Sequence, residues 1–185
     1  MNRRDALRGI SVLLGTAITP KVARAVHAGY TAPPLGQPLR TFDRRQRELV
    51  ATLAELIIPT TDTPGARAAR VDVFIDGLLT DIFTPGERDE FLEGLSSTDA
   101  HARAAYGVSI LECAPPQQVE VLATLEREAR EADDGSRAFF PWLKELTLVG
   151  YYTSEIGASQ ELSYVHVAGS YDGDIPYAQI GRAHS

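Results

Sequence analysis

Few residues of this 185-residue chain have the types and spacing that catalysis or metal binding requires. Its four histidines show no ligand spacing. The segment 172–174, Asp-Gly-Asp, lacks the later carboxylates of a calcium loop and is more typical of a tight turn. There is no G-x-G-x-x-G after a strand, no phosphate-binding loop, no G-x-S-x-G and no haem-attachment motif. We therefore expect no catalytic, cofactor-binding or metal site in this chain.

A stiff polar loop is the first of two candidate contact segments. Residues 57–66 read IIPTTDTPGA, with two prolines, a glycine and a run of hydroxyl and carboxylate side chains after an apolar helix. Such residues form local side-chain to backbone hydrogen bonds. A structural turn is the favoured interpretation, and a ligand loop is the alternative. The candidate contact residues are Pro59, Thr61, Asp62 and Pro64.

The second candidate segment is aromatic and begins in an apolar helix near residue 139. Between Pro141 and Tyr152 the strongly polar side chains are Lys144 and Glu145, so this helix should be covered on most sides. The following segment has no helical period, yet it is rich in tyrosine, which is enriched in protein interfaces. The alternative is that it wraps its own helices. The candidate contact residues are Tyr151, Tyr152, Glu155, Tyr164, Tyr171 and Tyr177.

Residues 1–25 have the pattern of an export signal. Basic residues including Arg3 and Arg4 precede an apolar run at 9–19, which is too short to span a bilayer, and a small-x-small end follows at 23–25. The paired arginines resemble the twin-arginine signal, which exports folded proteins. We expect a periplasmic protein cleaved after Ala25, or alternatively after Ala28. The other interpretation is an amphipathic N-terminal helix of the domain itself.

The remaining chain predicts a single all-α domain of about six helices. A Pro- and Gly-rich linker at 26–40 precedes the helical domain, at 41–157, and an irregular tail follows, at 158–185. No long strand pattern is present, although 164–167 could form one short strand. Thr41 is expected to cap the first helix, and Ser97 to Asp99 to cap the fourth. The predicted helices cover 41–58, 71–82, 84–95, 97–106, 117–132 and 141–152.

The charge and the single cysteine limit the possible partners. The net charge is −7, and residues 1–25 contain five basic and one acidic side chain, so the remainder carries −11. An acidic surface repels phosphate backbones, which argues against nucleic-acid binding. Cys113 has no second cysteine to pair with, and we expect it to be buried as a small apolar residue.

Three segments resemble the gluconate 2-dehydrogenase subunit 3 family, over about residues 41–177. They are IIPTTDTPGA at 57–66, ELTLVGYYTSEIG at 145–157 and GSYDGDIP at 169–176. The resemblance implies a helical small (gamma) subunit without its own redox group. It also implies an FAD-dependent dehydrogenase large subunit as partner, a cytochrome c subunit with haem in some complexes, and the twin-arginine translocase. The segment around Glu155 is most similar to members paired with dehydrogenases of glucosides.

We therefore expect a non-catalytic subunit that supports the maturation, stability and co-export of a sugar-oxidising flavoprotein. Two alternatives remain open on the sequence. One is a stand-alone periplasmic enzyme or ligand-binding protein that uses the Pro59–Gly65 loop and Glu155. The other is a chaperone that leaves its partner after export.

Overall fold

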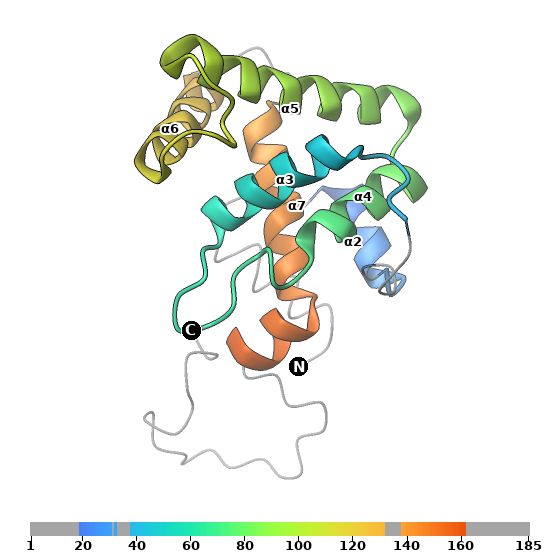
Figure 1. Cartoon of the computed structure of the whole chain (residues 1–185). Helices are drawn as coiled ribbons and strands as arrows, with labels where there is room; N and C mark the ends of the chain where they lie inside the picture. Colours follow the sequence, from blue (N-terminus) through green and yellow to red (C-terminus); the bar gives the residue numbers. More distant parts are fainter. Residues whose placement is uncertain (1–18, 31, 33–37, 132–137, 162–185) are drawn as a thin grey trace.

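The computed structural model describes residues 19–30, 32, 38–131 and 138–161, and all regular secondary structure within these ranges is helical (Figure 1). This confirms the predicted all-α fold. Tyr164, Tyr171, Tyr177, Arg3, Arg4 and the short strand considered at 164–167 lie outside the described residues. The helices are α2 (Pro20–His27), α3 (Arg44–Ile57), α4 (Val71–Asp81), α5 (Pro85–Tyr106), α6 (Pro115–Glu131), α7 (Phe139–Tyr152) and the π-helical turn η1 (Gly157–Glu161).

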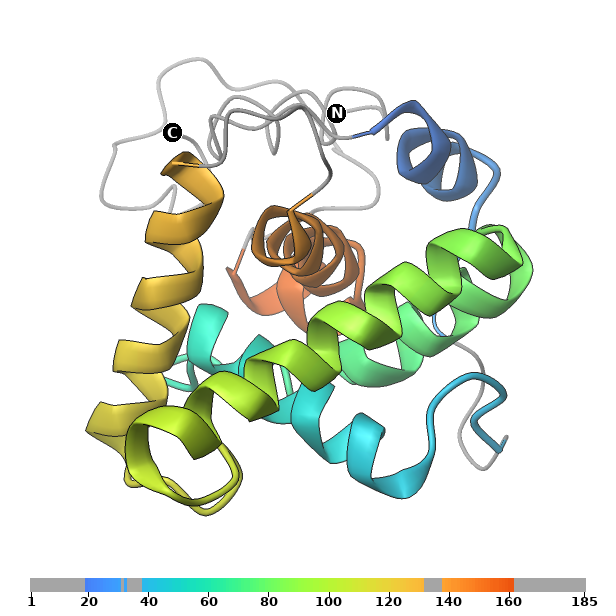
Figure 2. The same ribbon diagram turned by 90° about the horizontal axis from the view of Figure 1, so that it is seen from above.

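Helix α7 occupies the centre of the molecule. Figure 2 looks along it and shows the other helices arranged around it. Ten of its residues are buried, including Glu145, and Lys144 remains half-buried beside Glu126 of α6 at 3.5 Å. The prediction that this helix is covered on most sides is confirmed. Pro141 lies in its first turn, where backbone N–H groups have no intrahelical acceptor, so it breaks no helical hydrogen bond.

Helix α3 begins later than predicted. Its N-cap is Asp43, whose carboxylate accepts from the Gln46 backbone N–H at 2.7 Å while the Gln46 side chain accepts from Asp43 N–H. Thr41 was the expected cap, and that prediction is wrong. Its backbone N–H instead donates to the buried carboxylate of Asp76 in α4 at 2.9 Å. This bond fixes the segment that leads into α3.

The two short helices predicted at 84–95 and 97–106 are one continuous helix, α5. Ser97, Thr98 and Asp99 do not cap a new helix. The Thr98 hydroxyl donates to the Gly94 carbonyl one turn earlier, and the Asp99 carboxylate reaches sideways to a neighbouring loop. Because these side chains do not compete for the backbone N–H groups of the helix, the helical hydrogen bonds continue through residues 97–99. The continuous helix begins at a capping box formed by Thr84 and Glu87.

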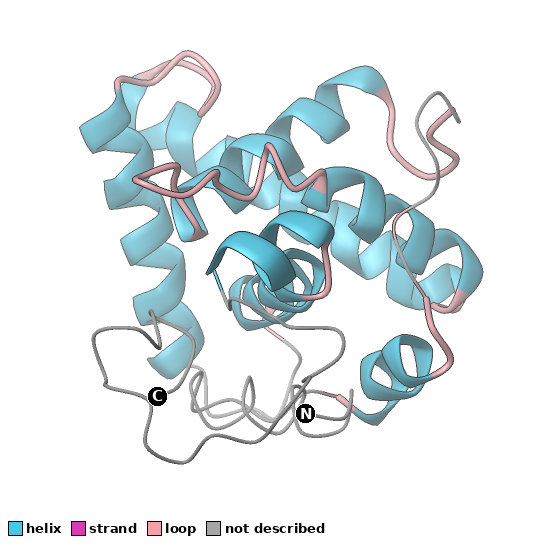
Figure 3. Ribbon diagram, turned by 90° about the horizontal axis from the view of Figure 1, so that it is seen from below, coloured by secondary structure: helices cyan, strands magenta, loops and turns pink. Residues whose placement is uncertain are grey.

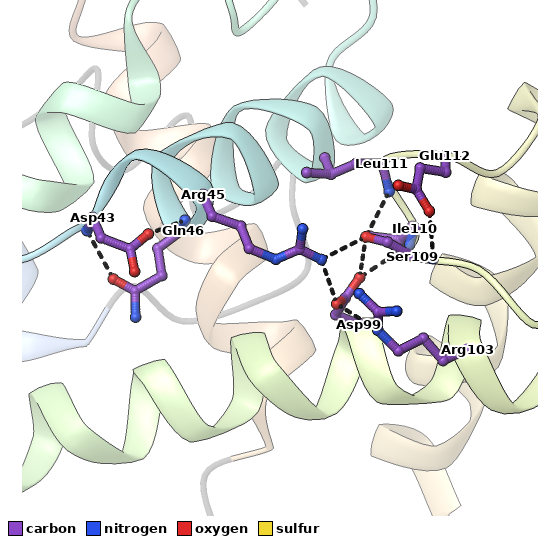
Figure 4. A network of polar contacts seen from close by, with 9 residues as sticks. All are labelled: Asp43, Arg45, Gln46, Asp99, Arg103, Ser109, Ile110, Leu111 and Glu112. Carbon is purple, nitrogen blue, oxygen red and sulfur yellow. Dashed lines mark hydrogen bonds and ion pairs between the residues drawn. The ribbon is translucent and has the colours of Figure 1, made fainter.

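Asp99 joins α5 to α3 and to the loop after α5 (Figure 4). Its carboxylate accepts from the Ser109 hydroxyl at 2.5 Å, from Ile110 N–H at 3.0 Å and from the Arg45 guanidinium of α3 at 2.7 Å. Arg103 also approaches it, at 3.2 Å. Burial acts to raise the pKa of Asp99, but the bonds from Ser109, Arg45 and Ile110 outweigh it and hold this pKa at about 2.

Cys113 lies in the loop before α6, and its side chain is 6% exposed. This confirms the expected burial of the thiol. Burial in turn raises the pKa of Cys113, with the Asp99 and Glu112 carboxylates adding to the shift. The thiol is therefore protonated at neutral pH and a poor nucleophile.

Helix α2 and the turn η1 extend the folded region beyond its predicted bounds at 41 and 157. Val22 of α2 is fully buried in the same core as α4, α5 and α7. At the other end, η1 continues the helical chain to Glu161. The linker predicted as a surface segment thus begins inside α2, at residue 26.

We expect Asp99→Asn to lower the free energy of unfolding by about 1–3 kcal/mol at pH 7, because an amide cannot accept all four of these bonds. The carboxylate has a lower pKa when folded than its ordinary value of 3.8, so its contribution is complete above pH 4 to 5 and is lost as the pH falls toward 2. Urea unfolding of both proteins from pH 7 to pH 2.5 measures this. A stability difference that does not shrink on acidification would contradict the assignment.

Candidate partner-binding surface

The polar loop between α3 and α4 is held from within by one carboxylate. Glu55, in the last turn of α3, accepts from Thr60 N–H at 2.9 Å, from the Thr60 hydroxyl at 2.7 Å and from Arg67 N–H at 2.9 Å. Partial burial acts to raise the pKa of Glu55, but these donors outweigh it and lower the pKa. Glu55 therefore remains ionised and fixes both ends of the loop.

Further bonds close the loop upon itself. Ala66 N–H donates to the Ile58 carbonyl at 3.0 Å, and Gly65 N–H donates to the Thr60 hydroxyl at 3.0 Å. At the tip, Thr61 N–H donates to the Thr63 carbonyl at 3.0 Å. These are the local side-chain and backbone bonds expected of an ordered structural turn.

Gly65 is required for this closure. A Cβ built on Gly65 would lie 2.6 Å from both Glu55 carboxylate oxygens and 2.6 Å from the Thr60 backbone nitrogen. Any side chain at this position would therefore push the carboxylate away from its donors. The glycine serves close approach here, not backbone freedom.

The loop meets the C-terminal end of α7, as Figure 3 shows from below. The Tyr151 hydroxyl donates to the Pro64 carbonyl at 2.8 Å, and the Thr63 hydroxyl donates to the Glu161 carboxylate of η1 at 2.7 Å. These bonds join residues 87 and 98 positions apart. The two segments singled out in the sequence, 57–66 and 145–157, therefore form one continuous surface.

Tyr151 and Tyr152 play different parts at this junction. The Tyr151 side chain is 1% exposed, and burial raises its pKa. It packs edge-on against Tyr152, with ring centroids 5.3 Å apart. Tyr151 thus supports the surface from within the chain's own core and is not available for contact in this structure, whereas Tyr152 is half-buried.

The chain turns at Ser154 before η1. The Ser154 hydroxyl accepts from Gly157 N–H at 3.1 Å, and Gly157 packs so closely that a Cβ there would collide with the Tyr151 carbonyl. This turn leaves Glu155 exposed. Its carboxylate lies near the start of a helical turn, where negative charge is favoured.

The other predicted contact residues lie on the outside of the same loop. Pro59, Thr61 and Asp62 are exposed, and Pro64 is half-buried over Tyr151. Three residues that position the loop were not predicted from the sequence: Glu55, Thr63 and Glu161. Glu55 had one signal: a carboxylate in the last turn of a helix faces the negative end of the helix dipole, so its presence there indicates a compensating partner.

Two general properties of the described residues bear on the kind of site. Within them, no group of three or more His, Cys, Asp or Glu side chains converges as metal ligands would. Among the described helices, none combines the length and the apolar character needed to cross a membrane.

Fold and surface together define a small helical protein in which an ordered loop and a helix end form one exposed surface. The family model described as gluconate 2-dehydrogenase subunit 3 matches residues 44–169, well over half of the chain. The chain belongs to this family, which confirms the resemblance seen in the sequence. Membership indicates an accessory subunit of a dehydrogenase complex. No curated protein and no solved structure matches the chain.

We expect Gly65→Ala to lower the free energy of unfolding by about 1–3 kcal/mol, the usual range for inserting a methyl group into a packed site. Gly86→Ala is the matched control. Gly86 lies in the first turn of α5, and a Cβ there meets nothing within 4 Å, so this variant should be neutral or slightly stabilising. Thermal unfolding of the two variants decides the matter, and equal melting temperatures would refute the close-approach role of Gly65.

Proposed function

We propose that this chain is the non-catalytic small subunit of a periplasmic complex whose large subunit is an FAD-dependent dehydrogenase of sugars or glucosides. The observation that carries the proposal is the junction between the 57–66 loop and the end of α7, sealed by Tyr151 and Pro64. Family membership supplies the class of complex. The large subunit would hold the FAD, and a cytochrome c subunit would carry electrons onward.

The geometry of the loop suits a contact role. Its backbone is fixed by Glu55 and Thr60 before any partner arrives, so binding would cost little ordering entropy. At its tip, Pro59, Thr61 and Asp62 are exposed. A rigid exposed segment of this kind is suited to recognise one complementary surface.

Beside the loop, Tyr152 offers an aromatic anchor. It is half-buried against Tyr151 and is therefore already oriented. Tyrosine is among the residues that dominate interface energetics, because it adds large contact area with few rotatable bonds. Glu155 is the nearby exposed carboxylate, and it would pair with a basic side chain of the large subunit.

The function of such contact is to stabilise the flavoprotein. A subunit that binds the folded large subunit and not its unfolded form raises its stability by mass action. The paired arginines Arg3 and Arg4 would then direct the assembled complex to the twin-arginine translocase.

We expect Tyr152→Ala to weaken binding of the large subunit by at least about tenfold, the effect of losing a typical hot-spot residue. Glu155→Arg should weaken it as well, by reversing an exposed charge. Glu90→Arg is the matched control: Glu90 is exposed on α5, a helix that lies at the opposite end of the molecule from η1 in Figure 1, and its reversal should leave affinity unchanged. Affinity is measured by surface-immobilised binding of the purified subunits.

Each result of that comparison has a defined meaning. Equal affinity of all three variants and the wild type would remove this surface as the docking site. Turnover of a sugar by the purified single chain would overturn the non-catalytic assignment.

The export role has its own test. Replacing Arg3 and Arg4 together by lysine keeps the charge but removes the paired guanidinium groups. Both subunits should then remain in the cytoplasm, as measured by dehydrogenase activity in the periplasmic fraction. Periplasmic activity that survives the double substitution would exclude the carrier role.

A further inference from the structure

Helix α2 packs into the hydrophobic core and covers apolar side chains of the rest of the domain, which we call the body. Val22 is fully buried, and Ala25 and Val26 are each 6% exposed. All three belong to the core that includes Phe83, Trp142 and Leu146. Figure 2 shows α2 against the body beside the first turns of α5.

Two polar contacts fix the N-terminal end of α2. The Thr19 backbone N–H donates to the Glu145 carboxylate at 2.6 Å, and Glu145, on the central helix α7, is only 8% exposed. Without α2 this carboxylate would lose the partner that offsets its burial. The Lys21 ammonium contacts both Glu87 oxygens at 2.6 Å and lies 5.2 Å from the centre of the Phe83 ring.

The C-terminal end of α2 is fixed in the same way. Gly29, with φ of +87°, turns the chain out of the helix, and Tyr30 N–H donates back to the Ala25 carbonyl at 3.0 Å. The Tyr30 ring packs edge-on against Phe74 of α4, with centroids 5.8 Å apart. Residues 19–30 therefore form a closed unit, which we call the latch.

The latch contains the bond at which the sequence predicts removal of the export signal. That bond follows Ala25 and lies inside α2, between two buried residues. Peptidases cut chain that has opened locally, so a docked helix protects the bonds within it. Cleavage after Ala28, the other predicted site, would also remove α2 and expose the core side chains that it covers.

We propose that the latch stays closed on the folded body and shields the bond after Ala25, so that residues 19–30 are retained in the mature protein. The last residues of the predicted export signal would then also be part of the folded domain. Retention keeps the Glu145 carboxylate hydrogen-bonded and Phe83 covered, whereas removal would expose the core side chains that α2 covers.

Trypsin cleavage after Arg24 tests the closure directly on the full purified chain, because this bond lies one residue before the predicted site and Arg24 itself is exposed. In the wild type, cleavage here should be slow. Val22→Asp places a charge at a fully buried site and should speed cleavage at least about tenfold by releasing the latch. Val119→Asp makes the same change at a valine that is 56% exposed on α6, and its rate should match the wild type.

A milder variant covers the case in which Val22→Asp unfolds the whole chain. Glu87→Gln keeps the helix-capping contact with Thr84, since glutamine serves at this position of a capping box, but loses the ion pair with Lys21. It should speed cleavage a few-fold while circular dichroism shows an intact body. Fast cleavage of the wild type, or no difference between Val22→Asp and Val119→Asp in folded chains, would overturn the latch.

The mass of the wild-type chain taken from periplasmic complex gives the second measurement, and this arm alone rests on the proposed export function. We expect the chain to include residues 19–30. A chain that begins at Val26 or Gly29 would overturn retention. Absence of the protein from the periplasm would instead count against the export proposal, while the trypsin comparison would still decide closure.

Discussion

The whole structure depends on the burial of α7 among helices that approach it from several sides. A helix that is apolar around most of its circumference is stable in water only when other elements cover it. Close approach is built in: a Cβ at Gly150 would lie 2.7 Å from the Phe74 ring of α4. Two polar side chains on α7 are tied to particular neighbours, Glu145 to the start of α2 and Tyr151 to the 57–66 loop. The central helix thereby decides where both the latch and the candidate docking surface lie.

The candidate surface separates support from contact. Among the residues that shape it, Glu55 and Tyr151 direct their polar groups to this chain's own backbone, and Gly65 leaves room for the Glu55 carboxylate. Residues that a partner could reach, such as Thr61 and Glu155, are exposed. This division is what a preorganised interface requires, because the geometry is paid for by folding and not by binding. It also means that substitutions of the two groups should differ in kind, since one group acts on stability and the other on affinity.

Much of the fold could be predicted from the sequence because it depends on local residue patterns. The period of α7, the proline start of α6 and the capping box at Thr84 each depend on residues within a few positions. The errors arose where a distant partner decided the outcome. Asp99 looked like a cap, but Arg45 and Ile110 engage it from outside the helix. Asp43 and not Thr41 caps α3, because the Thr41 N–H donates to Asp76, 35 positions away.

Contacts between distant residues also decide the features of the candidate surface that could not be predicted. The 57–66 loop was recognisable from its prolines and hydroxyls, yet its junction with α7 is a tertiary fact carried by a hydrogen bond over 87 positions. Tyr151 and Tyr152 are adjacent in sequence and of one residue type, so composition predicted one role for both. Their positions on a helix differ by about 100° of rotation, which turns one ring into the core and leaves the other at the boundary. For a tyrosine-rich segment, the helical phase at which it leaves the core therefore decides which rings a partner can meet.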